Sequence, residues 1–185
     1  VAFRMLPKVV WEMPELGTFN LHASLLPNYR GAAPINWAII NGETKTGVTT
    51  FFIDDKIDTG AMILGAETAI EPTENAGQLH DRLMHLGSKT VIETLALIEK
   101  GNVPTTIQED PANIKTAYKL NKENCKIDLT KSALEINNLI RGLSPYPAAW
   151  CFFGDNNEEW NVKIYEAKII SEAHSKAIGS LICTK

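Results

Sequence analysis

Strand-like and helical runs alternate along the first part of the sequence, and this alternation constrains the fold more than any other feature. Apolar and polar side chains alternate over residues 18–24, which is the period of two expected for a strand. Residues 46–53, rich in Val, Thr and Phe, predict a buried strand, and 62–70 predict another. Residues 34–40, followed by Asn41-Gly42, predict a short helix. The alternation predicts an α/β fold with a mostly parallel sheet.

The longest predicted helix covers residues 76–100, where apolar side chains recur close to every 3.6 residues. Asn75 and Gln78 predict a capping box at its start, and Gly101 predicts its end. The period slips once, near Gly87. The predicted buried face consists of Ala76, Leu79, Leu83, Leu86, Val91, Leu95 and Ile98.

A second, smaller domain is predicted after this helix. Residues 102–113 contain two prolines and show no clear period, so we divide the chain into a first domain over 1–108, a linker over 109–130 and a second domain over 131–185. In the second domain we expect a short helix over 131–141, then strands over 148–153 and 162–170. The buried face of that helix is predicted to be Ala133, Ile136, Leu139 and Ile140. This β domain looks incomplete at Lys185, and the chain starts at Val1 rather than Met, so a fragment is expected.

Composition removes several classes of function. The net charge is −4, which excludes a basic field over the whole surface for nucleic acid, although not a local basic patch. Three widely spaced cysteines without a Cys-x-x-Cys pair argue against disulfides and zinc and favour the cytoplasm. The apolar runs are too short to span a membrane, so we expect no membrane partner.

Two polar residues on the first predicted strand are candidates for catalysis. Asn20 and His22 are two positions apart, so their side chains leave the same face of the strand, about 7 Å apart. An amide can donate to a developing oxyanion, and an imidazole can carry a proton. From spacing alone, the pattern is more often that of two polar residues on the solvent side of a half-buried strand.

Asp58 lies in the polar turn 54–60 and is the candidate partner of the imidazole, because a loop carboxylate can hold a histidine in one tautomer. A solvated turn is the alternative, since Asp and Gly are common in turns. A magnesium cluster of Asp54, Asp55 and Asp58 is disfavoured, because no helical period directs the three carboxylates toward one point.

These residues belong to a longer ordered pattern. It runs Asn20-x-His22-x-Ser24-Leu25-Leu26-Pro27-x-x-Arg30-Gly31-Ala32-Ala33-Pro34 and continues with Gly42-Glu43, Thr46-Gly47-Val48-Thr49 and Asp58-Thr59-Gly60. The pattern resembles the 10-formyltetrahydrofolate-dependent formyltransferase family, and the resemblance extends from residue 2 to about residue 150. It implies the C-terminal part of a Rossmann-like catalytic domain, followed by the start of a small OB-like β-barrel.

Within that family, the branch that acts on tRNA is the most similar. The resemblance implies transfer of a formyl group from 10-formyltetrahydrofolate to the α-amino group of methionine on initiator methionyl-tRNA, for translation initiation. It implies that Asn20 and a protonated His22 stabilise the oxyanion, while Asp58 orients His22 and helps to move a proton. No metal is implied, and the complete protein is expected to be monomeric.

The resemblance also implies a folate pocket, with the following cofactor-binding residues: Ser24, Leu25, Leu26, Pro27, Arg4, Met5 and Leu6. Five lysines near the domain junction are candidates for contacts with tRNA phosphates, although a solvated linker explains them equally well: Lys115, Lys119, Lys122, Lys126 and Lys131.

Two other functions are kept open. One is a sister enzyme, either a sugar-nucleotide formyltransferase or the hydrolase domain of formyltetrahydrofolate dehydrogenase. The other is a non-catalytic folate- or RNA-binding remnant, against which the complete set of Asn20, His22 and Asp58 argues. Because the family's domain begins with further βα units, we expect the 185-residue chain alone to have little transferase activity.

Overall fold

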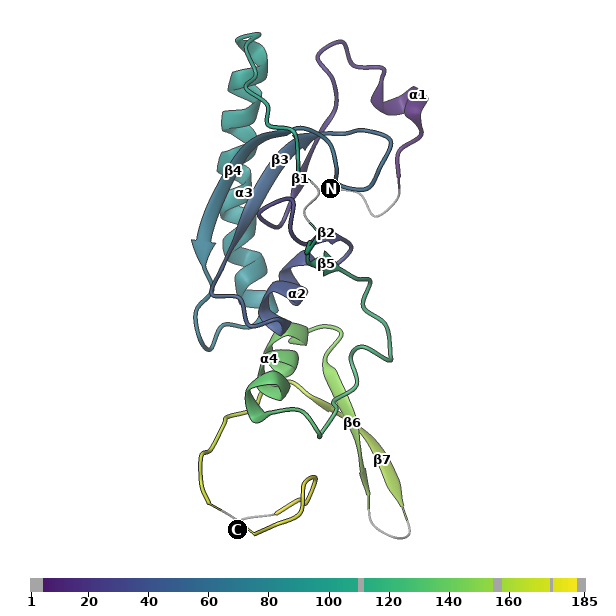
Figure 1. The fold of residues 1–185 in the computed structure, drawn as a ribbon, viewed down its shortest axis with the longest axis vertical. Helices are drawn as coiled ribbons and strands as arrows, with labels where there is room; N and C mark the ends of the chain where they lie inside the picture. The colour runs from purple at the N-terminus through teal and green to yellow at the C-terminus, as the bar shows by residue number, and fades with distance from the viewer. Residues whose placement is uncertain (1–4, 110–111, 155–157, 174, 183–185) are drawn as a thin grey trace.

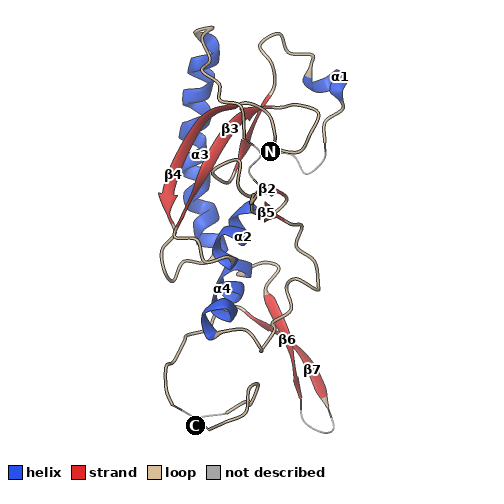
Figure 2. Cartoon of the chain, viewed as in Figure 1, coloured by secondary structure: helices blue, strands red, loops and turns tan. Residues whose placement is uncertain are grey.

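The computed structural model describes residues 5–109, 112–154, 158–173 and 175–182 (Figure 1). A three-stranded sheet and the long helix occupy one end of the molecule, and a short helix and a hairpin occupy the other (Figure 2). The elements in chain order are α1 (Lys8–Trp11), β1 (Phe19–His22), β2 (Arg30–Gly31), α2 (Pro34–Ile40), β3 (Lys45–Phe52), β4 (Met62–Ala69), α3 (Ala76–Glu99), β5 (Thr116–Ala117), α4 (Ala133–Leu143), β6 (Ala149–Gly154) and β7 (Glu159–Ile164).

The main sheet is antiparallel, and the prediction of a mostly parallel sheet is wrong for the described residues. Its strand order is β1-β3-β4, and β3 runs antiparallel to both neighbours. Residues 53–61 join β3 to β4, and this connection is too short for a parallel crossover, which needs about a dozen residues or more. The three strands themselves were predicted, and β3 is buried along almost its whole length because it is central.

Helix α3 covers one face of this sheet, and its predicted start is confirmed (Figure 1). Gln78 donates its backbone N–H to Asn75 Oδ1 at 2.9 Å, and Asn75 donates its own to Gln78 Oε1 at 3.0 Å. The C-cap is Lys100, and Gly101 follows with a φ of 71°. Satisfied caps of this kind stabilise both ends of a long surface helix.

The second half of α3 buries a different face from the one predicted. Leu95 is half exposed, whereas Gly87, Thr90 and Thr94 face the sheet. A Cβ on Gly87 would lie 2.7 Å from a methyl group of Leu21, so the period slips there because β1 packs closely. The Thr94 hydroxyl pairs with that of Thr50 at 2.8 Å, which satisfies both polar groups inside the interface.

The other end of the molecule has its own buried cluster, formed by α4, β6 and the chain between residues 125 and 127. The helix starts with a capping box between Ser132 and Glu135. Ile136, Leu139 and Ile140 pack as predicted, whereas Ala133 is exposed because it lies in the first turn, beyond the cluster. The second predicted strand is displaced, since β7 covers 159–164 and residues 165–170 form no strand.

The segment between α3 and α4 packs against both ends of the molecule. Its β5 pairs in parallel with β2, and Lys126 forms a bridge with Trp150 of β6. Ala117 belongs to the cluster under the main sheet, and Cys125 belongs to the cluster around α4. Helices α2 and α4 also pack on each other, where Asn36 donates to the carbonyl oxygen of Gly142 at 2.8 Å.

Within the described residues, no helix combines the length and the apolar character that a membrane crossing requires.

Candidate active site

Strand β1 holds Asn20 and His22 at the edge of the sheet, next to β3. Asn20 pairs with Phe51, and His22 pairs with Thr49. The side chain of His22 is buried, at 8% exposure, which argues against a solvated strand face for this residue. Asn20 Oδ1 accepts from the backbone N–H of Leu21 at 3.0 Å. The Nδ2 group is therefore the part of this amide that can donate a hydrogen bond to a ligand.

A strained turn presents Asp58 to the same region. Asp58 has a φ of 55°, which is uncommon for a residue with a side chain. Its Oδ2 accepts from the backbone N–H of Gly31 at 2.9 Å. The turn closes at Gly60, where an added Cβ would lie 1.7 Å from the carbonyl oxygen of Phe52, so only glycine fits. The carboxylate is therefore fixed by its own backbone and by strand β2.

His22 and Asp58 form the central pair of the site. Nδ1 of the ring lies 3.7 Å from Asp58 Oδ2, which is an ion-pair distance but too long for a good hydrogen bond. Nε2 lies 2.7 Å from the carbonyl oxygen of Tyr29, so this nitrogen carries a hydrogen and donates it. Both ring nitrogens thus face an acceptor, Nε2 at hydrogen-bond distance and Nδ1 at a longer, electrostatic distance.

The four residues at 24–27 divide into buried and accessible positions. Ser24 is fully buried, and its hydroxyl donates to the carbonyl oxygen of Asn28 at 2.7 Å, while Leu26 is also buried. Leu25 and Pro27 are partly exposed. A hollow of about 220 Å³ adjoins Leu25 and Leu26 and is closed on the other side by β4. Within this strip, Leu25 and Pro27 offer the accessible side chains.

The chain start contributes less to the described site. Arg4 lies outside the described residues. Met5 is 63% exposed and Leu6 is 40% exposed, so neither is packed into the core of the described chain.

The magnesium alternative gains no support from the acidic turn. Asp54 accepts from the Thr59 hydroxyl at 2.8 Å and from the backbone of Lys56 at 3.0 Å, which makes it a turn-stabilising residue. Over the described part of the chain, no group of three or more His, Cys, Asp or Glu side chains has the arrangement of a metal site.

Three residues that the sequence analysis did not single out support the site. Thr49 donates its hydroxyl to the carbonyl oxygen of Ser24 at 2.7 Å and accepts from the backbone of Leu26 at 3.2 Å. Tyr29 supplies the carbonyl that holds His22, and Gln108 bonds to the Asp58 turn. Thr49 is a named position of the quoted motifs, Tyr29 stands at an unspecified position within them, and Gln108 lies outside every motif.

Tyr29 is anchored by Glu43, to which its hydroxyl donates at 2.5 Å. Burial and this carboxylate raise the pKa of Tyr29, so the phenol stays protonated. Burial acts to raise the pKa of Glu43, but hydrogen bonds from Lys115 and Tyr29 outweigh it and leave the pKa below its ordinary value. The loop that carries the Tyr29 carbonyl is thus tied to the turn after α2 and to the segment before β5.

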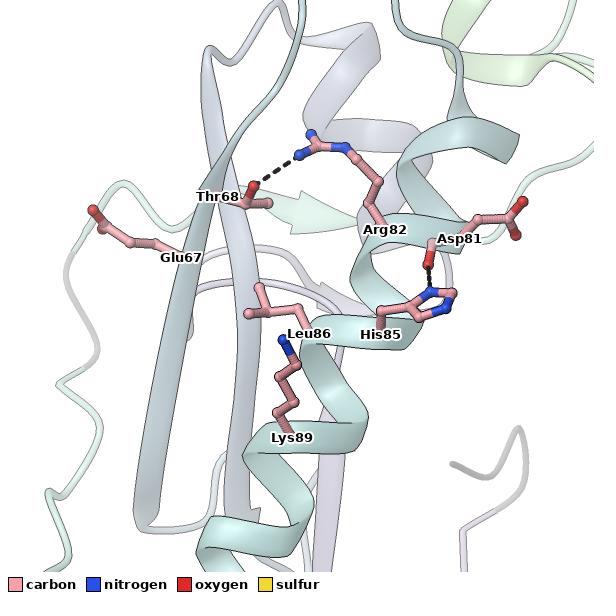
Figure 3. Close-up of a pocket in the computed structure, with 7 residues that line it drawn as sticks. All are labelled: Glu67, Thr68, Asp81, Arg82, His85, Leu86 and Lys89. Atoms are coloured by element: carbon pink, nitrogen blue, oxygen red, sulfur yellow. Dashed lines mark hydrogen bonds between the residues drawn. The ribbon is translucent and has the colours of Figure 1, made fainter.

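A second hollow, of about 450 Å³, lies between β4 and α3 (Figure 3). Two of its polar side chains are bonded within the protein, since Arg82 donates to Thr68 at 3.0 Å and His85 bonds the backbone of Asp81 at 2.8 Å. None of the predicted catalytic or cofactor-binding residues lines it.

Four of the five lysines of the domain junction lie beside a carboxylate or an aromatic ring, and Lys119 is exposed. Lys115 pairs with Glu43, and Lys131 lies 3.9 Å from Glu135. Lys122 and Lys126 lie over the ring of Trp150, at 5.3 and 5.4 Å from its centroid, which are cation–π distances.

Sequence profiles of two domains match the chain. The profile described as formyl transferase matches residues 2–95, and that described as formyl transferase, C-terminal domain, matches residues 119–185. The chain belongs to the formyl transferase family. The family resemblance of the motifs is therefore confirmed, and the formyl transferase match contains Asn20, His22 and Asp58.

A methionyl-tRNA formyltransferase from Flavobacterium johnsoniae is 82% identical over the whole of this chain, which covers 59% of that relative. The chain thus spans about three fifths of the length of the curated relatives that it matches. Two solved formyltransferases share the fold. One is an N-formyltransferase from Helicobacter canadensis in complex with folinic acid and dTDP-3-aminofucose, which is 30% identical with a TM-score of 0.61, over 67% of this chain and 46% of that one. The other is a 4-N formyltransferase from Francisella tularensis, which is 21% identical with a TM-score of 0.71, over 91% of this chain and 69% of that one.

Proposed function

We propose that the complete protein transfers a formyl group from 10-formyltetrahydrofolate to the α-amino group of initiator methionyl-tRNA. The observation that carries this proposal is the buried pair of His22 and Asp58, at 3.7 Å, next to Asn20 in a chain of this family. The identity of 82% to a methionyl-tRNA formyltransferase supports the choice of acceptor.

In this proposal the neutral amine attacks the formyl carbon, and the carbonyl oxygen becomes an oxyanion. Asn20 donates an Nδ2 hydrogen to that oxygen, and protonated His22 donates the second hydrogen bond. Loss of one such donor costs about 3 kcal/mol in the barrier, or about a hundredfold in rate. The tetrahedral intermediate then collapses, the bond to N10 of the folate breaks, and the proton lost by the amine is delivered to N10 with the help of His22 and Asp58.

His22 has to exchange one partner for this to occur. Nε2 is bonded to the carbonyl of Tyr29 in the described conformation, and Nδ1 faces Asp58. Rotation of the ring away from Tyr29 frees one N–H for the formyl oxygen, at the cost of a hydrogen bond with a net value of about 1 kcal/mol. Asp58 then keeps the charged ring close to the substrate.

The remaining assignments extend the same proposal. Folate, as co-substrate, is placed beside Ser24, Leu25, Leu26 and Pro27, with Arg4, Met5 and Leu6 on the chain-start side of the pocket. Residues 1–108 form the C-terminal part of a Rossmann-like catalytic domain, 109–130 a linker, and 131–185 the start of an OB-like barrel. The complete protein is proposed to be cytoplasmic and monomeric, and to use no metal.

Lys122 and Lys126 are the proposed contacts to tRNA phosphate among the five candidate lysines. Both ammonium groups lie on the face of Trp150, and Lys126 also lies 5.4 Å from the ring centroid of Phe152, which is 42% exposed. A basic group beside an accessible aromatic ring suits a phosphate and a neighbouring base.

A comparison of acceptors tests the proposed function. The complete protein is incubated with 10-formyltetrahydrofolate and either methionyl-tRNA or an amino-sugar nucleotide, and the formylated product is measured by mass. We expect formyl-methionyl-tRNA to accumulate. Formylation of the sugar nucleotide without formylation of the tRNA would favour the sister enzyme, and binding of folate without any transfer would favour the non-catalytic remnant.

A further inference from the structure

Gln108 uses every polar hydrogen-bonding atom of its side chain inside the protein. The residue is buried at 8% exposure, in the chain between α3 and β5. Its Nε2 donates to the carbonyl oxygens of Asp58 at 2.9 Å and Gly60 at 2.8 Å. Its Oε1 accepts from two nitrogens of Arg30, at 3.0 and 2.8 Å. One amide thus links the acidic turn to the side chain of Arg30 in strand β2.

The position of the Asp58 carboxylate depends on the two segments that Gln108 joins. The turn supplies the carboxylate from a residue with a φ of 55°, a conformation that needs support from its surroundings. Strand β2 supplies the Gly31 N–H, which donates to Asp58 Oδ2 at 2.9 Å. Gln108 holds the backbone of the turn on one side of this contact and the side chain of Arg30, the residue before Gly31, on the other, so it helps to set where Oδ2 lies relative to His22.

We propose that Gln108 is a positioning residue for the Asp58–His22 pair. The role rests on the proposed formyl transfer, in which Asp58 acts through the imidazole, and Gln108 itself touches no substrate. A displacement of a catalytic group by about 1 Å can reduce the rate by about a hundredfold. Loss of the amide therefore lowers kcat and leaves both KM values nearly unchanged.

Two substitutions separate this role from simple support of Arg30. Gln108→Leu removes all four hydrogen bonds. Gln108→Glu retains oxygen acceptors for Arg30, but a carboxylate cannot donate to the carbonyl oxygens of Asp58 and Gly60. If Gln108 acts through the Asp58 turn, both variants lose activity, whereas support of Arg30 alone predicts that the Glu variant retains it.

The experiment uses the complete protein and two readouts. Steady-state formyl transfer gives kcat and KM, and the amide proton shift of Gly31, measured by NMR, reports the position of the Asp58 carboxylate without any turnover. We expect kcat to fall by about ten- to a hundredfold in both variants, with KM changed by less than about twofold. We also expect the Gly31 amide proton to move upfield as its bond to Oδ2 weakens. Gln78→Leu, the same change in the exposed cap of α3, is the matched control, and its activity and Gly31 shift should equal those of the unmodified protein.

A Gly31 shift that stays at the unmodified position in both Gln108 variants overturns the proposal, whatever the activity, because the carboxylate has then not moved. A kcat within about threefold of the unmodified value overturns it as well. If the Leu variant does not fold, Gln108→Asn, which keeps the amide on a shorter side chain, is measured in its place and judged by the same two criteria. If the unmodified protein transfers no formyl group, the proposed function fails, while the Gly31 shift still decides whether Gln108 positions Asp58.

Discussion

Asp58→Asn removes the charge of the carboxylate and changes little else. The amide oxygen of asparagine can still accept from the Gly31 N–H, which lies 2.9 Å from Oδ2. The hydrogen bond from Gln108 Nε2 goes to the backbone carbonyl oxygen of Asp58, so the Asp58 side chain takes no part in it. The substitution therefore isolates the electrostatic effect of Asp58 on His22.

The magnitude follows from the distance and burial of the pair. The two groups are 3.7 Å apart, and their side chains are 8% and 14% exposed, so water screens them poorly. At an effective dielectric constant of about 20, two unit charges at this distance attract by about 4 kcal/mol. The cost of burying the carboxylate cancels part of this attraction, and about 2–3 kcal/mol remains. In the transition state, where His22 is positively charged, this corresponds to about a hundredfold in kcat.

The assay is single-turnover formyl transfer by the complete protein, with thermal unfolding measured in parallel. We expect Asp58→Asn to lower the transfer rate by about a hundredfold and to leave the unfolding temperature nearly unchanged. Asp81→Asn is the matched control, because Asp81 is exposed on α3 and remote from the predicted site residues. A rate within about threefold of the unmodified protein would show that the charge of Asp58 does not act on the reaction.

Two further predictions concern the supports of the site. Gly60→Ala places a Cβ 1.7 Å from the carbonyl oxygen of Phe52, so the turn must shift. We expect the free energy of unfolding to fall by about 3 kcal/mol and transfer activity to be lost. Gly65→Ala is the control, because the nearest atom to its added Cβ is 3.8 Å away, and it should be nearly neutral in urea unfolding. Hydrogen bonds from Lys115 and Tyr29 lower the pKa of Glu43, although the burial of Glu43 acts to raise it. Glu43 therefore stabilises the fold at pH values above its ordinary pKa of 4.5. This contribution is lost as the pH falls through the lowered pKa, so Glu43→Gln should reduce stability in urea at pH 7 and have a smaller effect the further the pH lies below 4.5. An effect that does not change with pH would contradict the assignment.

Local patterns predicted the elements well and their pairing poorly. The capping box at Asn75 and the buried strand β3 follow from short-range chemistry, and both are present. Strand direction depends on connections, and the alternation of element types suggested parallel strands where residues 53–61 form an antiparallel return. The buried face of α3 also changed after Gly87, because close packing of Leu21 favours small and hydroxyl side chains there.

The candidate site could be predicted where its residues share a motif. The structure brings His22 and Asp58 together, although 36 positions separate them in the sequence. Gln108 could not be predicted, since its importance comes from four hydrogen bonds made across distant loops and no pattern around it distinguishes it from other glutamines. Of the folate-binding candidates, Ser24 and Leu26 are buried, so their proposed part in the pocket is to shape it and not to present exposed side chains.

The most direct test of the central claim uses the His22→Asn variant of the complete protein. Its rate of formyl transfer to methionyl-tRNA and its affinity for folate are each measured and compared with those of the unmodified protein. We expect the transfer rate to fall by at least about a hundredfold, because the charged donor to the oxyanion and the proton carrier are lost, while folate still binds. A transfer rate close to that of the unmodified protein would contradict the assignment of catalysis to Asn20, His22 and Asp58.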